Sequence, residues 1–357
     1  MISLPNDQSA SASPARVCIL YTGGTIGMRK TPDGYLPAPG YLAAQMTVLN
    51  EFNNPALPEY EIIEFEPLLD SSNMRPDDWL KIAGCIQEQY AHHDGFVVVH
   101  GTDTMAYSAS ALAFLLEGLG KPVILTGSQI PLCEVRNDAV ENLVTALLIA
   151  GHYPVPEVCL YFGGKLLRGC RSVKVNASGL SAFDSPNYPP LGTAGIDLVM
   201  NWSAITPPPG EGTALHIAEN CRPMVAVLKL FPGIAPWMVE SFLRPPLQGA
   251  VLEAYGVGGA PDNDDALISA FQQATAQGII VVSITQCRQG MVNLASYATG
   301  TRLARAGVIS GMDMTSEAAL AKLFYLLGKE IPLAQVKEMM SQNLRGELTP
   351  ANPPWKR

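Results

Sequence analysis

The sequence predicts an α/β protein with a larger N-terminal domain, a mostly parallel sheet flanked by helices, and a smaller C-terminal α/β domain. Short strands that are apolar throughout alternate with helical patterns, which is typical of a parallel sheet covered on both faces. The chain has 357 residues, of which 48% are hydrophobic and 15% charged, so two well-buried cores are expected. The proline- and glycine-rich stretch 207–212 interrupts the alternation and predicts a linker.

Four segments follow from this pattern. Residues 1–15 are polar and small and are expected to form a disordered or flexible tail. We expect the N-terminal α/β domain over residues 16–204, the linker over 205–223 and the C-terminal α/β domain over 224–357.

In the first domain, apolar runs and helical periodicity define the expected elements. The strands are predicted at 16–21, 61–66, 96–100, 123–126 and 158–162, and the helices at 76–92, 104–119 and 138–151. Since crossovers between parallel strands are right-handed, a ligand is expected at the carboxyl ends of these strands.

The alternation dissolves between Pro189 and Pro223 and then resumes. In the second domain, strands are predicted at 225–230, 250–255 and 279–285, and helices at 235–243, 264–277, 316–327 and 333–342. This half is therefore expected to be a smaller α/β domain.

Composition argues against several classes of protein. The net charge of -9 disfavours nucleic acid and anionic membranes as partners. The N-terminal residues lack the apolar core of a secretory signal, and Glu117, Gly118 and Lys121 break the longest apolar run, so neither secretion nor a membrane span is expected. The seven scattered cysteines form no C-x-x-C pair, which favours free thiols and a cytoplasmic location.

The first candidate for chemistry is the turn Tyr21-Thr22-Gly23-Gly24-Thr25-Ile26-Gly27, directly after an apolar strand. Glycines let the backbone adopt conformations that other residues resist, and they expose N–H groups to a ligand. This geometry suits a nucleophile or an anion-binding loop, although glycine turns after strands are also common in α/β proteins.

Other strand ends carry similar groups. His100-Gly101-Thr102-Asp103-Thr104 follows the strand at 96–100 and opens a helix, so a plain N-cap is also a good interpretation of it. Asp70-Ser71-Ser72, Thr126-Gly127-Ser128-Gln129 and Lys174 follow three further strands. Four successive strand ends would thus place hydroxyls or carboxylates at one edge of the sheet.

With these motifs together, the chain resembles the bacterial-type L-asparaginase family along nearly its whole length. Thr22-Gly23-Gly24-Thr25-Ile26-Gly27 and His100-Gly101-Thr102-Asp103-Thr104 match the two signatures of the family. The cytoplasmic type I branch of the family is resembled in particular by four further motifs: those around Asp70 and Thr126, Tyr255-Gly256-Val257-Gly258 and the stretch 341–347.

The resemblance implies an L-asparagine amidohydrolase that releases L-aspartate and ammonia, with 16–204 as the catalytic domain. It makes Thr25 the nucleophile that forms a covalent acyl-enzyme, assisted by Tyr35 in a flexible loop, with Thr102, Asp103 and Lys174 relaying the proton. The sequence leaves open whether Thr25 or Thr102 attacks first. The substrate-binding residues are expected to be Asp70, Ser71, Ser72, Thr102, Asp103 and Ser128, and the oxyanion donors Gly24, Thr25 and Thr102.

The resemblance also implies a homodimer or homotetramer with sites at subunit interfaces. Some type I members bind asparagine as an effector through an arginine just before the tyrosine that matches Tyr255. This chain has Glu253 there, so we expect that form of cooperativity to be lost.

Alternative functions have weaker support. No metal or cofactor is expected, since the five histidines show no ligand spacing and the glycine turns match neither G-x-G-x-x-G nor G-x-x-x-x-G-K-[ST]. The sequence contains no G-x-S-x-G motif, which disfavours a serine hydrolase of the nucleophile-elbow type. An amidase subunit of a tRNA-dependent amidotransferase shares both signatures but carries an additional N-terminal domain. A catalytically inactive binding module is disfavoured because every expected catalytic position is occupied by a suitable residue.

Overall fold

The structure is a computed structural model that describes residues 14–32, 34–218, 222–261, 263–295 and 298–350. The chain divides into two compact units, Met1–Ile217 and Ala218–Arg357. This division falls inside the segment 205–223 that the sequence predicts as a linker. Residues 1–13 of the expected tail lie outside the described residues.

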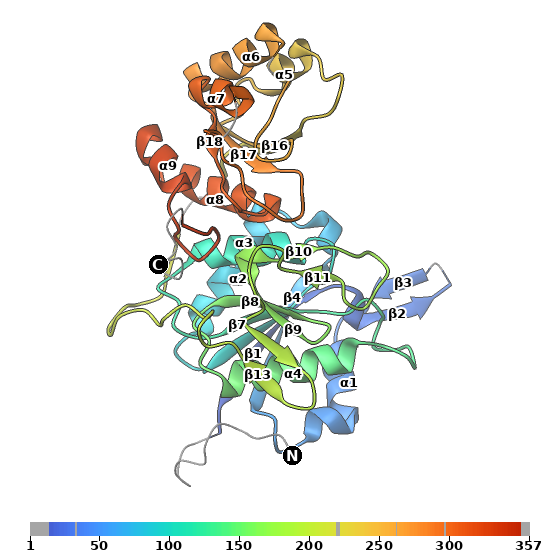
Figure 1. The fold of residues 1–357 in the computed structure, drawn as a ribbon. Coiled ribbons are helices and arrows are strands. Elements are labelled where there is room, and N and C mark those ends of the chain that lie inside the picture. The colour runs from blue at the N-terminus through green and yellow to red at the C-terminus, as the bar shows by residue number, and fades with distance from the viewer. Residues whose placement is uncertain (1–13, 33, 219–221, 262, 296–297, 351–357) are drawn as a thin grey trace. The chain divides into compact units, whose positions relative to one another are not determined.

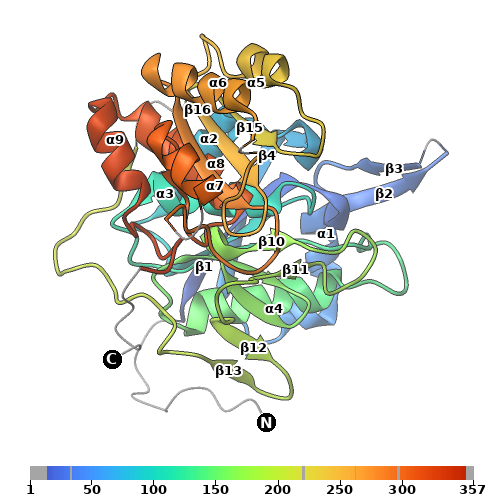
Figure 2. The same cartoon turned by 45° about the horizontal axis from the view of Figure 1, so that its top comes forward.

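The first unit is built on a sheet of eight strands in the order β13-β12-β9-β8-β7-β5-β1-β4 (Figure 1). Its strands are β1 (Arg16–Gly23), β4 (Glu59–Leu69), β5 (Gly95–Val99), β7 (Val123–Thr126), β8 (Val158–Phe162), β9 (Lys165–Arg168), β12 (Gly192–Ala194) and β13 (Leu198–Met200). The five strands from β4 to β8 are parallel, whereas β9, β12 and β13 add antiparallel pairs at one edge, as Figure 2 shows for the last two. The predicted larger, mostly parallel sheet is confirmed.

The order of the strands places a switch point between β1 and β5. The chain passes from β1 to β4 on one side, then crosses to β5 on the other side and continues to β7 and β8. In open parallel sheets, ligands bind at the carboxyl ends of the strands where the order reverses. The two glycine turns of the sequence follow these two strands.

Helices cover both faces of this sheet (Figure 1). Helices α2 (Pro76–Gln89) and α3 (Met105–Leu115) lie on one face, and α1 (Tyr41–Val48) and α4 (Ala139–His152) on the other. Alternate side chains of β1 and β5 belong to the same buried cluster as α1 and α4. The strands are apolar throughout because both of their faces are buried.

Three local expectations require correction. The helix predicted over 104–119 ends at Leu115, because β6 (Leu116–Glu117) leaves it to pair with β14 (His216–Ile217). The region 189–223 contains the antiparallel pair β12–β13 and is not irregular throughout. The segment expected as a flexible loop around Tyr35 forms a hairpin of β2 (Met28–Thr31) and β3 (Gly34–Pro37).

The second unit contains a parallel sheet in the order β15-β16-β17-β18, which confirms the predicted smaller α/β domain. Its strands are β15 (Val225–Lys229), β16 (Gly249–Ala254), β17 (Ile280–Thr285) and β18 (Ile309–Ser310), and its helices α5 (Pro236–Phe242), α6 (Asp265–Ala276), α7 (Ala298–Arg305), α8 (Ser316–Gly328) and α9 (Leu333–Met340). The sequence did not predict α7 or β18. Within the described ranges, no helix is long and apolar enough to cross a membrane.

Candidate active site

Two glycine turns meet at the carboxyl ends of β1 and β5. Gly23 and Gly24 have φ values of 129° and 92°, in the region that glycine adopts without strain. A Cβ on Gly24 would lie 2.5 Å from the backbone nitrogen of Gly101, and a Cβ on Gly101 would lie 2.4 Å from the Ser71 Oγ. A Cβ on Gly127 would lie 2.3 Å from the His100 carbonyl oxygen. Glycine is therefore required wherever the turns after β1, β5 and β7 touch one another.

Thr25 follows the first of these turns. It begins the 3₁₀ turn η1 (Thr25–Gly27), and its side chain is half-buried. The N–H of a residue at the start of a helical turn has no partner within that turn, so it can bind a ligand. Within the described part of the chain, no hydrogen bond involves the Thr25 hydroxyl. By contrast, the Thr22 hydroxyl is buried and donates to the Val99 carbonyl at 2.9 Å.

Thr102, Asp103 and Lys174 lie in direct contact. Lys174 comes from the short strand β10 (Val173–Lys174), and its Nζ donates to Thr102 Oγ1 at 2.9 Å and to Asp103 Oδ1 at 2.7 Å. The Lys174 side chain is 19% exposed and that of Asp103 67%. The carboxylate can therefore accept a further bond from a ligand while it remains paired with the lysine.

A second contact of Thr102 was not predicted. Its hydroxyl donates to Gln129 Oε1 at 3.1 Å, and Gln129 lies on the turn after β7. This glutamine ends the motif that begins at Thr126, but the sequence predicted no role for it. The position of Gln129 could have indicated such a role, because Gln129 follows Thr126-Gly127 at the end of β7, the strand that pairs with β5.

A buried chain of hydrogen bonds lies behind Thr102. Trp79 Nε1 donates to Ser108 Oγ at 3.0 Å, and Ser108 Oγ lies 2.8 Å from His100 Nε2. His100 Nδ1 bonds the Gly101 carbonyl oxygen at 2.7 Å, so Nδ1 carries the proton and Nε2 accepts from Ser108. Burial lowers the pKa of His100 to about 4, opposed by the bond to Gly101, and keeps the ring neutral.

This chain fixes one peptide group of the site. The Gly101 carbonyl belongs to the same peptide as the N–H of Thr102, and these two groups point in opposite directions in a trans peptide. The bond from His100 therefore directs the Thr102 N–H away from the core. The sequence missed this role of His100.

The turn after β4 supplies the serines. Ser71 is buried and Ser72 exposed, both in the 3₁₀ turn η3 (Ser71–Asn73). Asp70 caps that turn by accepting from the Ser72 N–H at 3.0 Å. The Thr104 hydroxyl makes no cap bond to its own helix α3 and donates instead to the Ser71 carbonyl at 2.7 Å. Thr104 thus joins the strand ends of β4 and β5, which corrects the simple N-cap interpretation.

Ser128 is 1% exposed, and its Oγ has no hydrogen-bond partner among the described residues. Buried hydroxyls without a partner are uncommon and call for an explanation.

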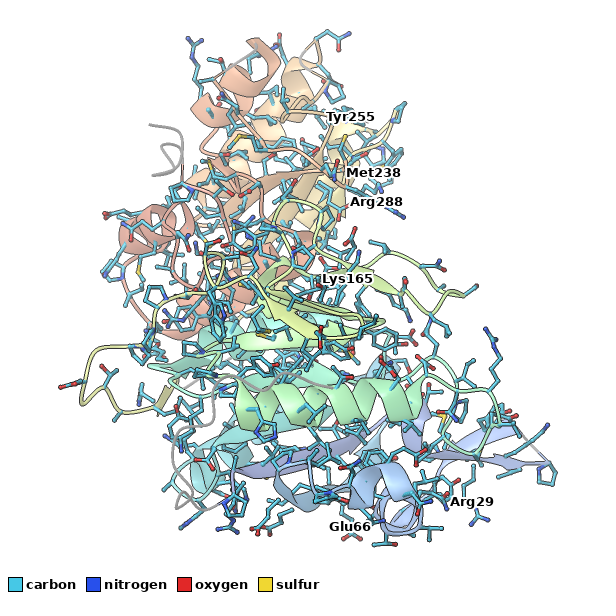
Figure 3. All side chains as sticks on the ribbon, turned by 60° about the horizontal axis from the view of Figure 1, so that its bottom comes forward. Arg29, Glu66, Lys165, Met238, Tyr255 and Arg288 are labelled. Atoms are coloured by element: carbon cyan, nitrogen blue, oxygen red, sulfur yellow. The ribbon has the colours of Figure 1, made fainter. Side chains whose placement is uncertain are left out.

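Tyr35 lies on β3 and is 40% exposed. Its hydroxyl donates to Glu134 Oε1 at 2.5 Å, and this bond raises the pKa of the tyrosine. The neighbouring strand β2 packs on α1 through Arg29, whose guanidinium lies 5.4 Å from the centre of the Tyr41 ring (Figure 3). The structure thus brings Tyr35 to Glu134 and not into the cluster of Thr102, Asp103 and Lys174.

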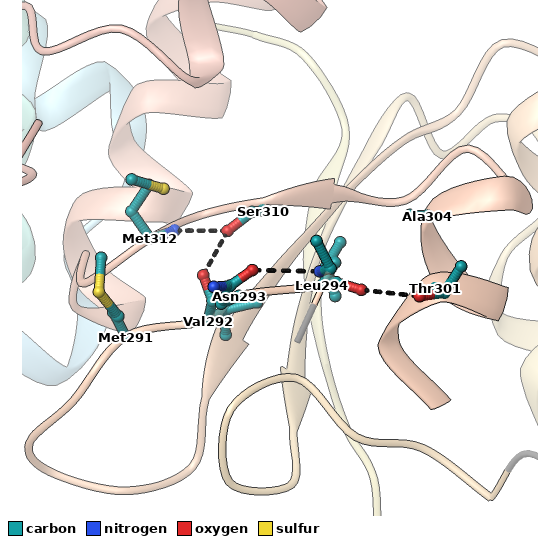
Figure 4. Close-up of a pocket in the computed structure, with 9 residues that line it drawn as sticks. Met291, Val292, Asn293, Leu294, Thr301, Ala304, Ser310 and Met312 are labelled. Atoms are coloured by element: carbon teal, nitrogen blue, oxygen red, sulfur yellow. Dashed lines mark hydrogen bonds between the residues drawn. The ribbon is translucent and has the colours of Figure 1, made fainter. Parts of the chain in front are cut away.

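The second unit contains a separate cavity of about 580 Å³ (Figure 4). Its described lining consists of Met291, Val292, Asn293, Leu294, Ala295, Thr301, Ala304, Ser310 and Met312. None of these side chains is titratable, so this lining offers no general acid or base. Among the described residues, no three His, Cys, Asp or Glu side chains are arranged to hold a metal ion.

Comparison with known proteins agrees with these motifs. Residues 16–206 match the family model of the asparaginase N-terminal domain, and residues 224–340 that of the glutaminase/asparaginase C-terminal domain. The chain is 50% identical to L-asparaginase 1 of Escherichia coli over 94% of this chain and 98% of that protein. The crystal structure of L-asparaginase I from Vibrio cholerae superposes with a TM-score of 0.87 at 45% identity, covering 94% of this chain and 100% of the other. A glutamyl-tRNA(Gln) amidotransferase subunit of Pyrococcus horikoshii is 35% identical over 94% of this chain and 77% of that protein.

Proposed function

Since this chain belongs to the asparaginase family, we propose that it is an L-asparagine amidohydrolase with Thr25 as nucleophile. The observation that carries the proposal is the contact of Lys174 with both Thr102 and Asp103, next to the turn that bears Thr25. The 50% identity to L-asparaginase 1 supports the same reaction. The amidotransferase subunit, which represents the alternative function, is only 35% identical to this chain.

The proposed reaction uses two acyl transfers. Thr25 Oγ1 attacks the side-chain amide carbon of asparagine, while the relay of Thr102 and Lys174 takes up its proton once the lysine is neutral. The N–H groups of Gly24, Thr25 and Thr102 stabilise the oxyanion, each contributing on the order of 3 kcal/mol. The relay returns this proton to the amide nitrogen, which leaves as ammonia, and water then hydrolyses the β-aspartyl ester on Thr25 to release L-aspartate.

The remaining residues bind the substrate in this proposal. The exposed carboxylate of Asp103 accepts the α-ammonium group, and Ser71 and Ser72, in the turn capped by Asp70, bind the α-carboxylate. The buried Ser128 hydroxyl, which lacks a protein partner among the described residues, bonds the substrate amide. Tyr35 assists Thr25 after it leaves Glu134.

The family resemblance also supports a cytoplasmic homodimer or homotetramer with sites at subunit interfaces. Analytical ultracentrifugation of the purified protein tests this assembly, and a monomer that retains full activity would contradict it.

An ammonia-release assay with L-asparagine, D-asparagine and L-glutamine tests the function. We expect L-asparagine to be the preferred substrate and Thr25→Ala to lower turnover by about three orders of magnitude or more. Thr22→Val is the matched control, because Thr22 bonds the Val99 carbonyl in the core and is expected to affect stability without abolishing turnover. Wild-type turnover in Thr25→Ala would refute Thr25 as the nucleophile.

A further inference from the structure

Gln129 joins three parts of the candidate active site. It lies on the turn after β7, and its Oε1 accepts from the Thr102 hydroxyl on the turn after β5 at 3.1 Å. Its Nε2 donates to the carbonyl oxygens of Ala177 and Gly179, each at 3.2 Å, in the loop that follows Lys174. The side chain therefore links the threonine and the lysine segment of the proposed relay.

The two carbonyl groups determine which way the amide of Gln129 faces. Backbone carbonyl oxygens only accept hydrogen bonds, so the NH₂ group must face Ala177 and Gly179, and Oε1 must face Thr102. An amide oxygen only accepts, so the Thr102 hydroxyl must donate to it. A lone pair of Thr102 Oγ1 is then left for the Lys174 ammonium at 2.9 Å.

We infer that Gln129 is a positioning residue that turns the Thr102 proton away from Lys174 and so favours the charged lysine in the resting site. This inference rests on the proposed function. A hydroxyl that donates one bond becomes a better acceptor of another, so the bond to Gln129 strengthens the bond from Lys174. Before Lys174 can take a proton from Thr102, the lysine must become neutral and the hydroxyl must rotate away from Gln129.

Hydrogen bonds hold the backbone of Gln129 in place independently of its side chain. Its N–H donates to both carboxylate oxygens of Asp138, at 3.1 and 3.0 Å. Asn142, which is 1% exposed, donates to the Gly127 carbonyl at 3.0 Å and to Asp138. The turn after β7 is thus tied to α4, so the position of Gln129 does not depend on its own side-chain contacts.

The charged groups around the relay each have a partner of their own. Asp103 is paired with Lys174, and Asp138 is bonded to the backbone behind Gln129. Asp184, on the strand paired with β10, bonds Lys165 at 3.2 Å. Glu134, on the loop after β7, accepts from Tyr35.

Two substitutions test the inference because they act in opposite directions. Gln129→Met has a similar length but offers Thr102 only a weak thioether acceptor, so the charged lysine is less favoured. We expect the acid limb of the pH profile of kcat/KM to move to lower pH, with KM changed less than about twofold. Gln129→Glu adds a carboxylate, favours the charged lysine and should move the same limb to higher pH, each shift being about half a pH unit or more.

A matched variant separates this role from loop stability. Asn176 accepts from the N–H groups of Ser178 and Gly179 in the same loop, and these bonds do not involve Thr102. Asn176→Ala loosens the loop, and we expect it to leave the acid limb where it is in the wild type. A shift of the acid limb in Asn176→Ala equal to that in Gln129→Met would overturn the inference, as would a wild-type pH profile in Gln129→Met.

A second readout does not depend on turnover. NMR of the labelled lysine side chains follows the loss of the Lys174 proton with pH in the wild type and both Gln129 variants. We expect the midpoint to move down in Gln129→Met and up in Gln129→Glu, and equal midpoints would refute the inference. A wild type without ammonia release would instead refute the proposed function alone.

Discussion

Gly24 and Gly101 touch backbone to backbone at the carboxyl ends of β1 and β5, where a Cβ on Gly24 would lie 2.5 Å from the Gly101 nitrogen. This contact brings the turn that carries Thr25 against the turn that carries Thr102. Each signature motif therefore depends on the other for its geometry, because a change in one turn displaces both threonines.

Gly24→Ala should abolish this arrangement. The alanine would meet backbone atoms at less than normal contact distance and would also keep an unfavourable φ of 92°, so the two turns must separate. We expect turnover to fall by about two orders of magnitude or more and the free energy of unfolding by roughly 1–3 kcal/mol. Ammonia release and urea unfolding measure the two effects.

Gly233→Ala is the control for backbone strain alone. Gly233 has nearly the same φ, 91°, but a Cβ there would meet nothing within 4 Å. We expect a loss of stability near the lower end of that range and unchanged turnover. Equal loss of turnover in both variants would show that the contact with Gly101 does not matter.

His100 should make stability depend on pH. Burial holds its pKa near 4 in the folded protein, against about 6.5 in the unfolded chain. Above pH 6.5 neither state binds the proton. Between about pH 6.5 and 4 only the unfolded state binds it, so the free energy of unfolding falls with falling pH, by roughly 3 kcal/mol over the whole interval.

Urea unfolding of the wild type and His100→Gln between pH 7 and 4.5 measures this term. The variant lacks the titrating group, so its stability should fall less steeply than that of the wild type. The exposed His92 provides the control, since His92→Gln should retain the wild-type slope. Parallel slopes for the wild type and His100→Gln would contradict the assignment.

How far the sequence predicted the structure depends on how far apart along the chain the interacting residues lie. The turns with Thr25 and Thr102 were placed at strand ends because local motifs mark them. Lys174 instead lies on β10, a short strand that the sequence did not predict, and only the family resemblance indicated its role. The end of α3 at Leu115 was not, since Leu116–Glu117 pairs with His216–Ile217, about a hundred residues along the chain. The hairpin of β2 and β3 was missed because the glycines and prolines that flank Tyr35 are typical of a loop.

The same reasoning explains the residues of the site that were missed. The role of Gln129 depends on carbonyl groups of Ala177 and Gly179, which only the folded loop brings to it. His100 acts through Ser108, one turn into the next helix, and Trp79 on another helix. No local pattern encodes such contacts.

The second unit should depend on a buried ion pair. Lys322 of α8 donates to Glu347 at 2.5 Å, and both side chains are 0% exposed. Lys322 also bonds the carbonyl oxygens of Met340 and Gln342, and Glu347 accepts from the N–H groups of Leu344 and Arg345. Lys322→Met leaves a buried carboxylate unpaired, which typically costs about 3–5 kcal/mol.

Denaturant unfolding of three variants tests this prediction. Lys322→Met combined with Glu347→Gln should recover part of the loss, because the uncompensated charge is gone. Lys81→Met is the surface control, since Lys81 is 65% exposed in its pair with Asp78 and should contribute about 1 kcal/mol or less. A loss in Lys322→Met no larger than that in Lys81→Met would refute a stabilising role for the buried pair.

Finally, we predict a hyperbolic dependence of rate on asparagine concentration. The family resemblance implies that some type I members use an arginine to bind asparagine as an effector, and this chain has Glu253 on β16 at that position. Glu253 Oε2 lies 3.8 Å from Lys229 Nζ, and a carboxylate there repels the carboxylate of an amino acid. Initial rates should therefore fit a Hill coefficient near 1, whereas a coefficient of about 1.5 or more would show that cooperative binding survives without the arginine.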